Sequence, residues 1–547
     1  MGIYLNPGSR QFEEALNSQI YVDKTAMVAD VNALVNTSRK YLCISRPRRF
    51  GKTMTASMLC AYYGQGEDRH AIFEHRMLAG CPDWDRYLGK FNVLRLTMTQ
   101  FLRRGVPFAE SLQRMQTRLG GDLRKEFPKL AFFDDNDIIS SLQDIYASQG
   151  IPFVIIIDEW DAIFREYPND HQAQKDYLDF LRNFLKDQDY VALAYMTGIL
   201  PIKKYGKHSA LNMFSEYSMT SQMQFAPYTG FTEEEVQLLC ANFGMDFNSI
   251  KEWYNGYKLF GTGIIDQSHR ATATPTNAAN ATVYCIYSPL SVVEAIMNKQ
   301  ITNYWNKTET YEALAEYIRM DFDGLKETVA KLMQGDKIKI SLGTYTNDMT
   351  SLTCRDDVMA LLIHLGYLGY DQSSGEVFIP NREILDEYRN STRTREWSST
   401  FRALKNSRQL VAATEAGDAD AIAELVEAAH DSAGNRTYNS EAALSYAIQL
   451  AYYAAQDDYT LFPEVDTGKG YADLLYVPKL PGKPAMLIEL KYNQNANTAL
   501  EQILRQKYPA RLEKYKGNLI LVGINYSHSA SPTTPDFKHH SCKVMRA

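Results

Sequence analysis

The sequence has no long hydrophobic run and no regular cysteine pattern. Its longest purely apolar runs, such as residues 153–157, are far shorter than the roughly 18 residues that a membrane span needs. The N-terminus lacks a basic segment followed by an apolar one, so no secretory signal is expected. The seven cysteines are scattered and include no CxxC pair, which indicates a reducing compartment and excludes a zinc framework of paired cysteines. We therefore expect a cytoplasmic protein that does not enter a membrane.

The chain also lacks an excess of one charge large enough to define its partners. Its 58 basic and 65 acidic residues give a net charge of −7, and its 45% hydrophobic and 22% charged residues are typical of a globular protein. A length of 547 residues exceeds one hydrophobic core, so two to four domains are expected. Between Lys479 and Lys516, eight basic residues outnumber three acidic ones. This local excess is either a surface that attracts phosphates or a solvated helix face.

Strands and helices are expected to alternate over the first 230 residues. Three short apolar runs of the buried-strand kind lie at 41–45, 153–157 and 191–197. Amphipathic stretches typical of helices lie at 53–63, 109–119 and 172–186. Strands separated by helices favour a parallel sheet with helices on its faces. The sequence therefore predicts an α/β domain over residues 1–230.

Two further regions follow. Residues 231–400 are expected to form a helical lid and a winged-helix-like linker, with Thr232 and Glu235 as the capping box of one helix. Within this region, 261–283 has the composition of a surface loop, and a helix over 357–368 precedes a hairpin around Gly375. Residues 401–547 are expected to form a second α/β domain. It would contain helices over 411–430, 441–455 and 500–515 and strands near 472–477, 486–491 and 519–524.

A phosphate-binding loop is expected directly after the strand at 41–45. The pattern GxxxxGK[ST] is met at Gly51, Lys52 and Thr53, while Arg46 replaces the first glycine. A glycine–lysine turn at a helix N-terminus directs backbone N–H groups at a phosphate. Lys52 would then reach the β- and γ-phosphates of ATP, and the Thr53 hydroxyl would bind Mg²⁺. The whole candidate loop consists of Arg46, Pro47, Arg48, Arg49, Phe50, Gly51, Lys52 and Thr53.

Two carboxylates follow the apolar run at 153–157. Asp158 at the end of this strand would complete the Mg²⁺ shell, and Glu159 would polarise the attacking water. Together with the upstream loop, this pair predicts nucleotide binding. Thr197 ends another expected strand, where it either senses the γ-phosphate or is simply a turn residue. No arginine finger can be named, and Arg182 is a suggestion from its position alone.

The N-terminal motifs resemble those of one family. They are YVDKT (21–25), RPRRFGKT (46–53), IIIDEWD (155–161) and TGILPIKKYGKHSALNMF (197–214), followed by GFTEEEV (230–236), WYNGYKL (253–259) and YSPLSVVEAI (287–296). Together they resemble the predicted AAA-ATPase-like proteins of bacteria, which often carry a C-terminal PD-(D/E)XK nuclease-superfamily domain. The resemblance implies that RPRRFGK[ST] is the usual phosphate loop despite Arg46, and that Asp158 and Glu159 form the Walker B pair.

The last 110 residues hold a second candidate site. Asp473 opens one expected strand, and Glu489 and Lys491 lie two apart on the next, so their side chains share one face. Asp473 and Glu489 would hold Mg²⁺, with Mn²⁺ as an alternative, and Lys491 would orient the nucleophile or stabilise the transition state. This D…ExK pattern is that of the PD-(D/E)XK superfamily. The resemblance adds Glu441 on an upstream helix and Gln502 on the next helix; a plain surface Glu–Lys pair is the alternative.

Taken together, these patterns predict three parts of the chain. They are a P-loop NTPase parallel-sheet domain (1–230), a helical and winged-helix-like middle region (231–400) and a restriction-endonuclease-like α/β domain (401–547). The expected function is an ATP-binding ATPase that gates metal-dependent hydrolysis of DNA or RNA, with homo-oligomerisation left open. The alternative is an ATP-dependent switch or scaffold whose nuclease-like domain only binds a partner.

Overall fold

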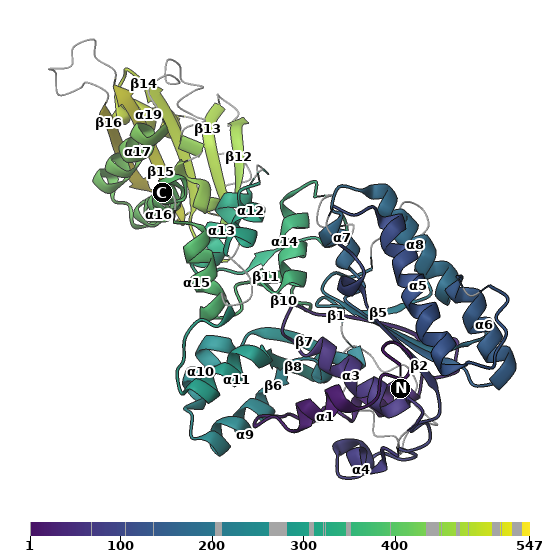
Figure 1. Ribbon diagram of the computed structural model, residues 1–547. Helices are drawn as coiled ribbons and strands as arrows, with labels where there is room; N and C mark the ends of the chain where they lie inside the picture. Colours follow the sequence, from purple (N-terminus) through teal and green to yellow (C-terminus); the bar gives the residue numbers. More distant parts are fainter. Residues whose placement is uncertain are drawn as a thin grey trace, which may run out of the picture. The chain divides into compact units, whose positions relative to one another are not determined.

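In the computed structural model the chain forms two compact units, Met1–Ser391 and Thr392–Ala547. Figure 1 labels most of their helices and strands. The structure describes residues 2–66, 68–103, 105–134, 136–202, 211–221, 223–261, 282–305, 311–320, 322, 324–345, 352–393, 395–433, 448–449, 451–466, 471–479, 481–505, 515, 517–527 and 539–547. The finer three-part division expected from the sequence stays a prediction.

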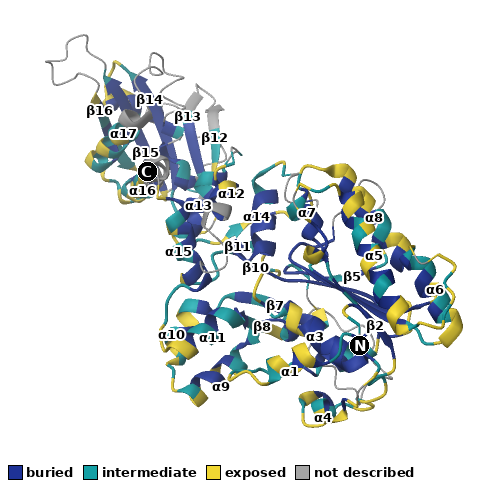
Figure 2. Cartoon of the chain, in the orientation of Figure 1, coloured by how far each residue is buried: buried dark blue, intermediate teal, exposed yellow. Residues whose placement is uncertain are grey.

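A five-stranded parallel sheet forms the centre of the first unit. Its order is β2 (Asn92–Thr97), β3 (Phe153–Asp158), β4 (Val191–Gly198), β1 (Tyr41–Ser45) and β5 (Ser215–Tyr217). All four neighbouring pairs are parallel. Every residue of β1, β3 and β4 is buried, which confirms the three strands expected from continuous apolar runs. The sheet is mostly dark blue in Figure 2. The two edge strands β2 and β5 were not expected, because β2 carries Asn92 and Arg95 and β5 has only three residues.

Helices cover both faces of this sheet. On one face α1 (Arg10–Leu16), α2 (Met27–Asn32) and α3 (Lys52–Tyr63) share a hydrophobic core with β1 and β3. On the other side Figure 1 shows α5 (Phe108–Glu126), α7 (Ala162–Glu166) and α8 (His171–Leu185), with α6 (Ile138–Gln149) beside α5. The three expected helices therefore correspond to α3, α5 and α8. The first unit is built on an α/β fold with a parallel sheet, as expected.

A small antiparallel sheet and three helices follow the parallel sheet. The sheet order is β6 (Phe231–Thr232), β8 (Thr282–Tyr287) and β7 (Tyr257–Gly261). The helices are α9 (Glu233–Phe243), α10 (Phe247–Tyr254) and α11 (Pro289–Asn298). The capping box at the start of α9 is present as expected, with Thr232 and Glu235 each accepting a hydrogen bond from the other's backbone N–H. Most of the expected loop at 261–283 lies outside the described residues.

The first unit ends with the expected helix and hairpin. Helices α12 (Tyr311–Ile318) and α13 (Leu325–Met333) come first, followed by β9 (Ile338–Lys339) and α14 (Arg355–Leu365). Strands β10 (Gly369–Asp371) and β11 (Glu376–Phe378) form the antiparallel hairpin, and β9 pairs with β11. Helix α15 (Arg382–Ser391) closes the unit. The helix and hairpin expected over 357–378 are confirmed.

The second unit is a mixed five-stranded sheet with helices on both faces. The strand order is β12 (Tyr459–Asp466), β13 (Tyr471–Pro478), β14 (Ala485–Tyr492), β15 (Leu519–Ser527) and β16 (His539–Arg546), and only β14 and β15 run parallel. Helices α16 (Arg395–Ala416) and α17 (Ala419–Ala433) share one core with the sheet, and α19 (Ala496–Arg505) shares another. Gly417, at φ +82°, separates α16 from α17, so the helical stretch expected over 411–430 belongs to two helices.

Candidate functional site

The candidate phosphate loop connects the end of β1 to the start of α3. Arg49 and Gly51 have positive φ angles of 68° and 86°, a left-handed conformation that glycine adopts without steric cost. A side chain at Gly51 would meet no atom within 4 Å, so the space above this turn is open. Helix α3 begins at Lys52, directly after the turn. Its first N–H groups are therefore available to an anion held above the loop.

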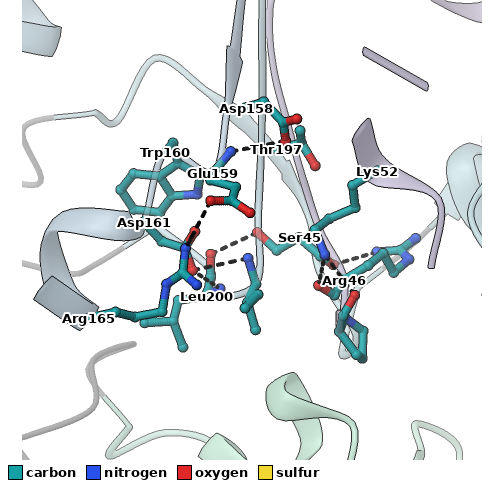
Figure 3. A network of polar contacts seen from close by, with 12 residues as sticks. Ser45, Arg46, Lys52, Asp158, Glu159, Trp160, Asp161, Arg165, Thr197 and Leu200 are labelled. Carbon is teal, nitrogen blue, oxygen red and sulfur yellow. Dashed lines mark hydrogen bonds and ion pairs between the residues drawn. The ribbon is translucent and has the colours of Figure 1, made fainter. Parts of the chain in front are cut away.

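The side chain of Lys52 folds back over the loop. Its Nζ atom donates to the carbonyl oxygens of Arg46 and Pro47, at 2.9 and 2.7 Å (Figure 3). The residue is 8% exposed, and burial lowers its pKa to about 8, although Asp161 and Asp158 favour the charged form. A cation that rests on two carbonyls can exchange them for phosphate oxygens at small cost.

Arg46, at the position of the missing glycine, faces the protein interior. Its side chain is fully buried, and Nη1 donates to the carbonyl oxygens of Ser45 and Tyr217 at 2.8 and 3.0 Å. Burial lowers its pKa to about 10. The structure thus uses the Arg46 side chain to join β1 to β5. Of the predicted loop residues, those from Arg48 to Thr53 line the cavity, and Arg46 and Pro47 contribute the carbonyls that hold Lys52.

Asp158 lies at the end of β3, two strands from the loop. Because β4 separates β1 from β3, the loop and this carboxylate are roughly 10 Å apart at the strand level, a gap that side chains span. Burial raises the pKa of Asp158, and a hydrogen bond from Thr53 opposes that change. Its buried Oδ2 atom has no hydrogen-bond partner among the described residues. This oxygen and the Thr53 hydroxyl fit a Mg²⁺ ion, which prefers such donors.

Thr197 at the end of β4 lies between these groups in strand order. Its side chain is fully buried, and Oγ1 donates to the carbonyl oxygen of Ile44 at 3.0 Å. It does not line the cavity. In this conformation the hydroxyl therefore links β4 to β1, and a role at the γ-phosphate stays a prediction.

Glu159, Asp161 and Arg165 form a polar cluster next to Lys52 (Figure 3). Glu159 has a φ of 53° and lines the cavity. Asp161 is fully buried and accepts hydrogen bonds from the backbone N–H groups of Ile199 and Leu200, at 3.1 and 3.0 Å. Asp161 and Arg165 were missed by the sequence analysis. The signals were an additional acid inside IIIDEWD and an arginine four residues after it.

The loop, Glu159 and Arg165 line one cavity of about 840 Å³. Its polar and charged lining residues include Lys52, Thr53, Glu159 and Arg165, together with Arg48 and Arg49. Its apolar lining includes side chains such as Ile20, Val22, Phe231, Leu290, Val293 and Met297. This volume lies within the roughly 300–1,000 Å³ typical of small-ligand sites. Cationic side chains for phosphates and apolar side chains for a base suit the chemistry of a nucleotide. Arg182 lies exposed on α8 and is not part of the cavity.

The second candidate site lies at the adjoining ends of β13 and β14. In the antiparallel pairing of β13 with β14, Leu474 lies opposite Ile488. In this register, the next pair of opposite residues is Asp473 and Glu489. Asp473 Oδ2 accepts from the Leu490 backbone N–H at 2.7 Å. On β14, Ile488 and Leu490 belong to the core shared with α16 and α17, so Glu489 points to the other face.

Glu489 and Lys491 form a buried ion pair. The distance from Lys491 Nζ to Glu489 Oε1 is 3.0 Å, and the two residues are 8% and 1% exposed. Burial and the Asp473 charge raise the pKa of Glu489 to about 7. Glu489 Oε2 has no hydrogen-bond partner within the described part of the chain. This buried oxygen and the Asp473 carboxylate fit a divalent cation that takes oxygen ligands.

The other two residues predicted for this site are Gln502 and Glu441. Gln502 is half-buried on α19, which packs on β14 and β15. Glu441 lies outside the described residues. Within the described residues there is no group of three or more His, Cys, Asp or Glu side chains that could hold a metal ion. The described carboxylates of the second site are therefore the pair Asp473 and Glu489.

Comparisons with known proteins find a matching family model for part of each unit. Residues 8–206 match the family model "Predicted AAA-ATPase", and residues 444–531 match "PD-(D/E)XK nuclease superfamily". The chain therefore carries an N-terminal AAA-ATPase-like domain and a C-terminal domain of the PD-(D/E)XK nuclease superfamily. This confirms the resemblance drawn from the sequence motifs.

A curated bacterial relative carries no assigned activity. The chain is 24% identical over 309 residues to the "Uncharacterized protein in vnfD 5'region" of Azotobacter chroococcum mcd 1. This match covers 54% of the chain and 52% of that protein, so the chain spans about half the length of the curated relative it matches. Among solved structures, the "Aeropyrum Pernix ORC2 protein (ADPNP-ADP complexes)" matches 68% of the chain and 96% of its own, at 10% identity. Its TM-score of 0.26 is too low to support an argument. Across the described residues, no helix is both long and apolar enough to cross a membrane.

Proposed function

We propose that the protein binds and hydrolyses ATP in its first unit and uses the nucleotide state to control metal-dependent cleavage of nucleic acid by its second unit. The observation that carries this proposal is that each unit brings several side chains of the required types close together near the ends of its strands. Lys52, Thr53 and Asp158 lie close together in the first unit, and Asp473, Glu489 and Lys491 do so in the second.

In the first unit, the cationic side chains of the cavity would hold the triphosphate. Lys52 would leave its two loop carbonyls and donate to the β- and γ-phosphate oxygens. Mg²⁺ held by Thr53 and Asp158 would neutralise phosphate charge. Glu159 would orient the attacking water, whose oxygen bonds to the γ-phosphorus as the bond to the bridging oxygen of ADP breaks. The apolar side chains that line the cavity would contact the base.

In the second unit, the buried face of β14 would hold the scissile phosphate. A divalent cation bound by Asp473 and Glu489 would supply Lewis acidity to the phosphate and to water. Lys491, held 3.0 Å from Glu489, would orient that water or donate to the phosphate in the transition state. The water oxygen bonds to phosphorus, and one phosphodiester P–O bond breaks. The basic segment from Lys479 to Lys516 would attract the nucleic-acid backbone.

The phosphate loop is packed against the region that connects it to the second unit along the chain. Phe50 contacts Tyr257 of β7 edge-on, with ring centroids 5.3 Å apart, and its carbonyl accepts from the Gly230 N–H at 3.0 Å. Pro47 lies so close to Gly366, at the end of α14, that a side chain there would approach it to 2.8 Å. A loop that moves on binding phosphate would therefore displace β7 and α14. We infer that this displacement is how the nucleotide state reaches the second unit.

A cleavage assay tests the proposal. The purified protein receives single- and double-stranded DNA and RNA with Mg²⁺, with Mn²⁺ or with EDTA, each with and without ATP. We expect cutting that requires metal, vanishes in Lys491→Ala and changes with ATP, and we expect Lys52→Ala to lose only the ATP effect. Lys543→Ala, which removes an exposed lysine from β16, should cut like the wild type.

The alternative is an ATP-dependent switch whose second unit binds a partner without cutting. One observation favours this alternative. Burial raises the pKa of the Glu489 carboxyl, and a protonated Glu489 binds a cation poorly. ATP hydrolysis without cleavage of any of the four nucleic acids, whether or not the second unit binds metal, would support this alternative and contradict the nuclease proposal.

A further inference from the structure

Arg165 is a cation in the nucleotide cavity with little hydrogen bonding of its own. It lies on α7, lines the cavity beside Glu159 and Lys52, and its side chain is 17% exposed. Its Nη2 atom is 3.6 Å from Glu159 Oε2 and 4.0 Å from Asp161 Oδ1. Both distances exceed a hydrogen bond. The buried Nε and Nη2 atoms have no hydrogen-bond partner among the residues that the structure describes.

A buried guanidinium with unpaired N–H donors can form hydrogen bonds with an incoming ligand. Leaving buried donors unpaired costs free energy, so structural arginines usually satisfy them. The planar fork of donors fits two oxygens of a phosphate, which a lysine cannot match. Arg165 lines the same cavity as Lys52 and Thr53. The lining of the cavity therefore contains a cation outside the phosphate loop.

Asp161 lies next to this arginine, with 4.0 Å between Asp161 Oδ1 and Arg165 Nη2. The Asp161 carboxylate is fully buried and accepts from the Ile199 and Leu200 N–H groups after β4. Arg165 follows four residues later on α7, so the two side chains lie on one face of the helix. Gly198 permits this packing, because a Cβ atom there would come within 2.6 Å of Asp161 Oδ1. The same chain that binds the nucleotide thus positions Arg165 without help from a neighbour.

We propose that Arg165 is a catalytic arginine supplied in cis, an inference that rests on ATP hydrolysis as the proposed function. Without nucleotide it pairs loosely with Glu159. With ATP bound it donates to oxygens of the γ-phosphate and releases Glu159 to orient water. Arg165 then stabilises the charge that builds up as the water oxygen bonds to the γ-phosphorus and the bond to ADP breaks. The water's proton leaves through Glu159 or the released phosphate.

Arg165→Ala and Arg165→Lys test the role of the side chain. An arginine at this position is typically worth roughly 10³-fold or more in kcat, and we expect a loss of that order in both variants. ATP affinity should fall roughly ten-fold or more while ADP affinity stays unchanged, because only ATP has the γ-phosphate. Unchanged ADP binding also reports that the variant is folded. Arg10→Ala, which removes an exposed arginine paired with Glu14 on α1, serves as the matched control and should behave like the wild type.

A mixing experiment separates action in cis from action between subunits. Lys52→Ala keeps Arg165 but cannot bind ATP productively, and Arg165→Ala keeps the phosphate loop. If Arg165 acts in cis, an equimolar mixture stays inactive and the wild-type kcat does not depend on protein concentration. Recovery of activity on mixing would overturn the proposal, because the arginine would then reach a neighbour's site.

Two further results are also decisive. The first is that the wild type hydrolyses ATP and the Arg165→Ala protein has the same kcat and the same ATP affinity. This result would overturn the role of Arg165 and leave the proposed function standing. A wild type that neither binds nor hydrolyses ATP overturns the proposed function and this inference with it. The two failures are thus distinguishable.

Discussion

Glu383 offers a sharp test of the electrostatics of the first unit. It is 1% exposed on α15, and its Oε1 atom accepts from the backbone N–H groups of Tyr304 and Trp305, at 2.7 and 2.9 Å. Its Oε2 atom accepts from Ser291 Oγ on α11 at 2.8 Å. Burial, together with the nearby Glu387 carboxylate, raises the pKa of Glu383 to about 7 despite these donors.

The sign of the resulting pH dependence follows from proton binding. In the unfolded chain this carboxyl titrates near 4.5, and in the folded protein near 7. Between these values the folded state holds a proton that the unfolded state has lost, so the free energy of unfolding falls as pH rises. The full change across this window is about 3 kcal/mol. Glu383→Gln keeps an oxygen that accepts from both N–H groups and removes the titrating carboxyl. The free energy of unfolding of this variant should therefore not show this fall as pH rises.

Hydrogen exchange at the Tyr304 and Trp305 amides measures this effect locally, which avoids assuming two-state unfolding of a chain with two units. After correction for intrinsic rates, protection in the wild type should decrease from pH 5 to pH 7.5, and protection in Glu383→Gln should stay nearly constant. Glu252→Gln alters an exposed glutamate paired with Arg382 and should keep the wild-type slope. The reasoning is refuted if the wild type and Glu383→Gln show the same slope.

Two other predictions concern the nucleotide site. The charged form of Lys52 binds phosphate and burial lowers its pKa to about 8, so ATP affinity should weaken as pH rises above about 8. Titration with a fluorescent ATP analogue from pH 7 to 9.5 measures this, and a Lys52→Arg protein with the same pH profile would contradict it. Gly198→Ala places a Cβ 2.6 Å from Asp161 Oδ1 and should destabilise the protein by about 1–3 kcal/mol. Gly121→Ala, in an α5 position with open space around it, should be neutral or stabilising in the same thermal unfolding experiment, and an equal loss in both would contradict the packing argument.

Features that depend on neighbouring residues were readable from the sequence. The continuous apolar runs predict β1, β3 and β4 because a strand buried on both faces needs no polar position. The Thr232 and Glu235 spacing predicts a capping box because its hydrogen bonds close within four residues. The turn around Gly51 and the Asp158–Glu159 pair follow from local pattern in the same way, and so does the shared face of Glu489 and Lys491.

Features that depend on packing between distant segments became visible only in the tertiary structure. Arg46 replaces a loop glycine in sequence, but only the position of β5 shows that its side chain bonds the Tyr217 carbonyl. Asp161 Oδ2 accepts hydrogen bonds from backbone groups 38 and 39 residues away, and its other oxygen lies 4.0 Å from Arg165 Nη2. The raised pKa of Glu489 likewise reflects desolvation, which depends on everything that surrounds a group. Local spacing therefore determined which residue types stand at each strand end, while burial and long-range contacts decided the direction, charge and partners of their side chains.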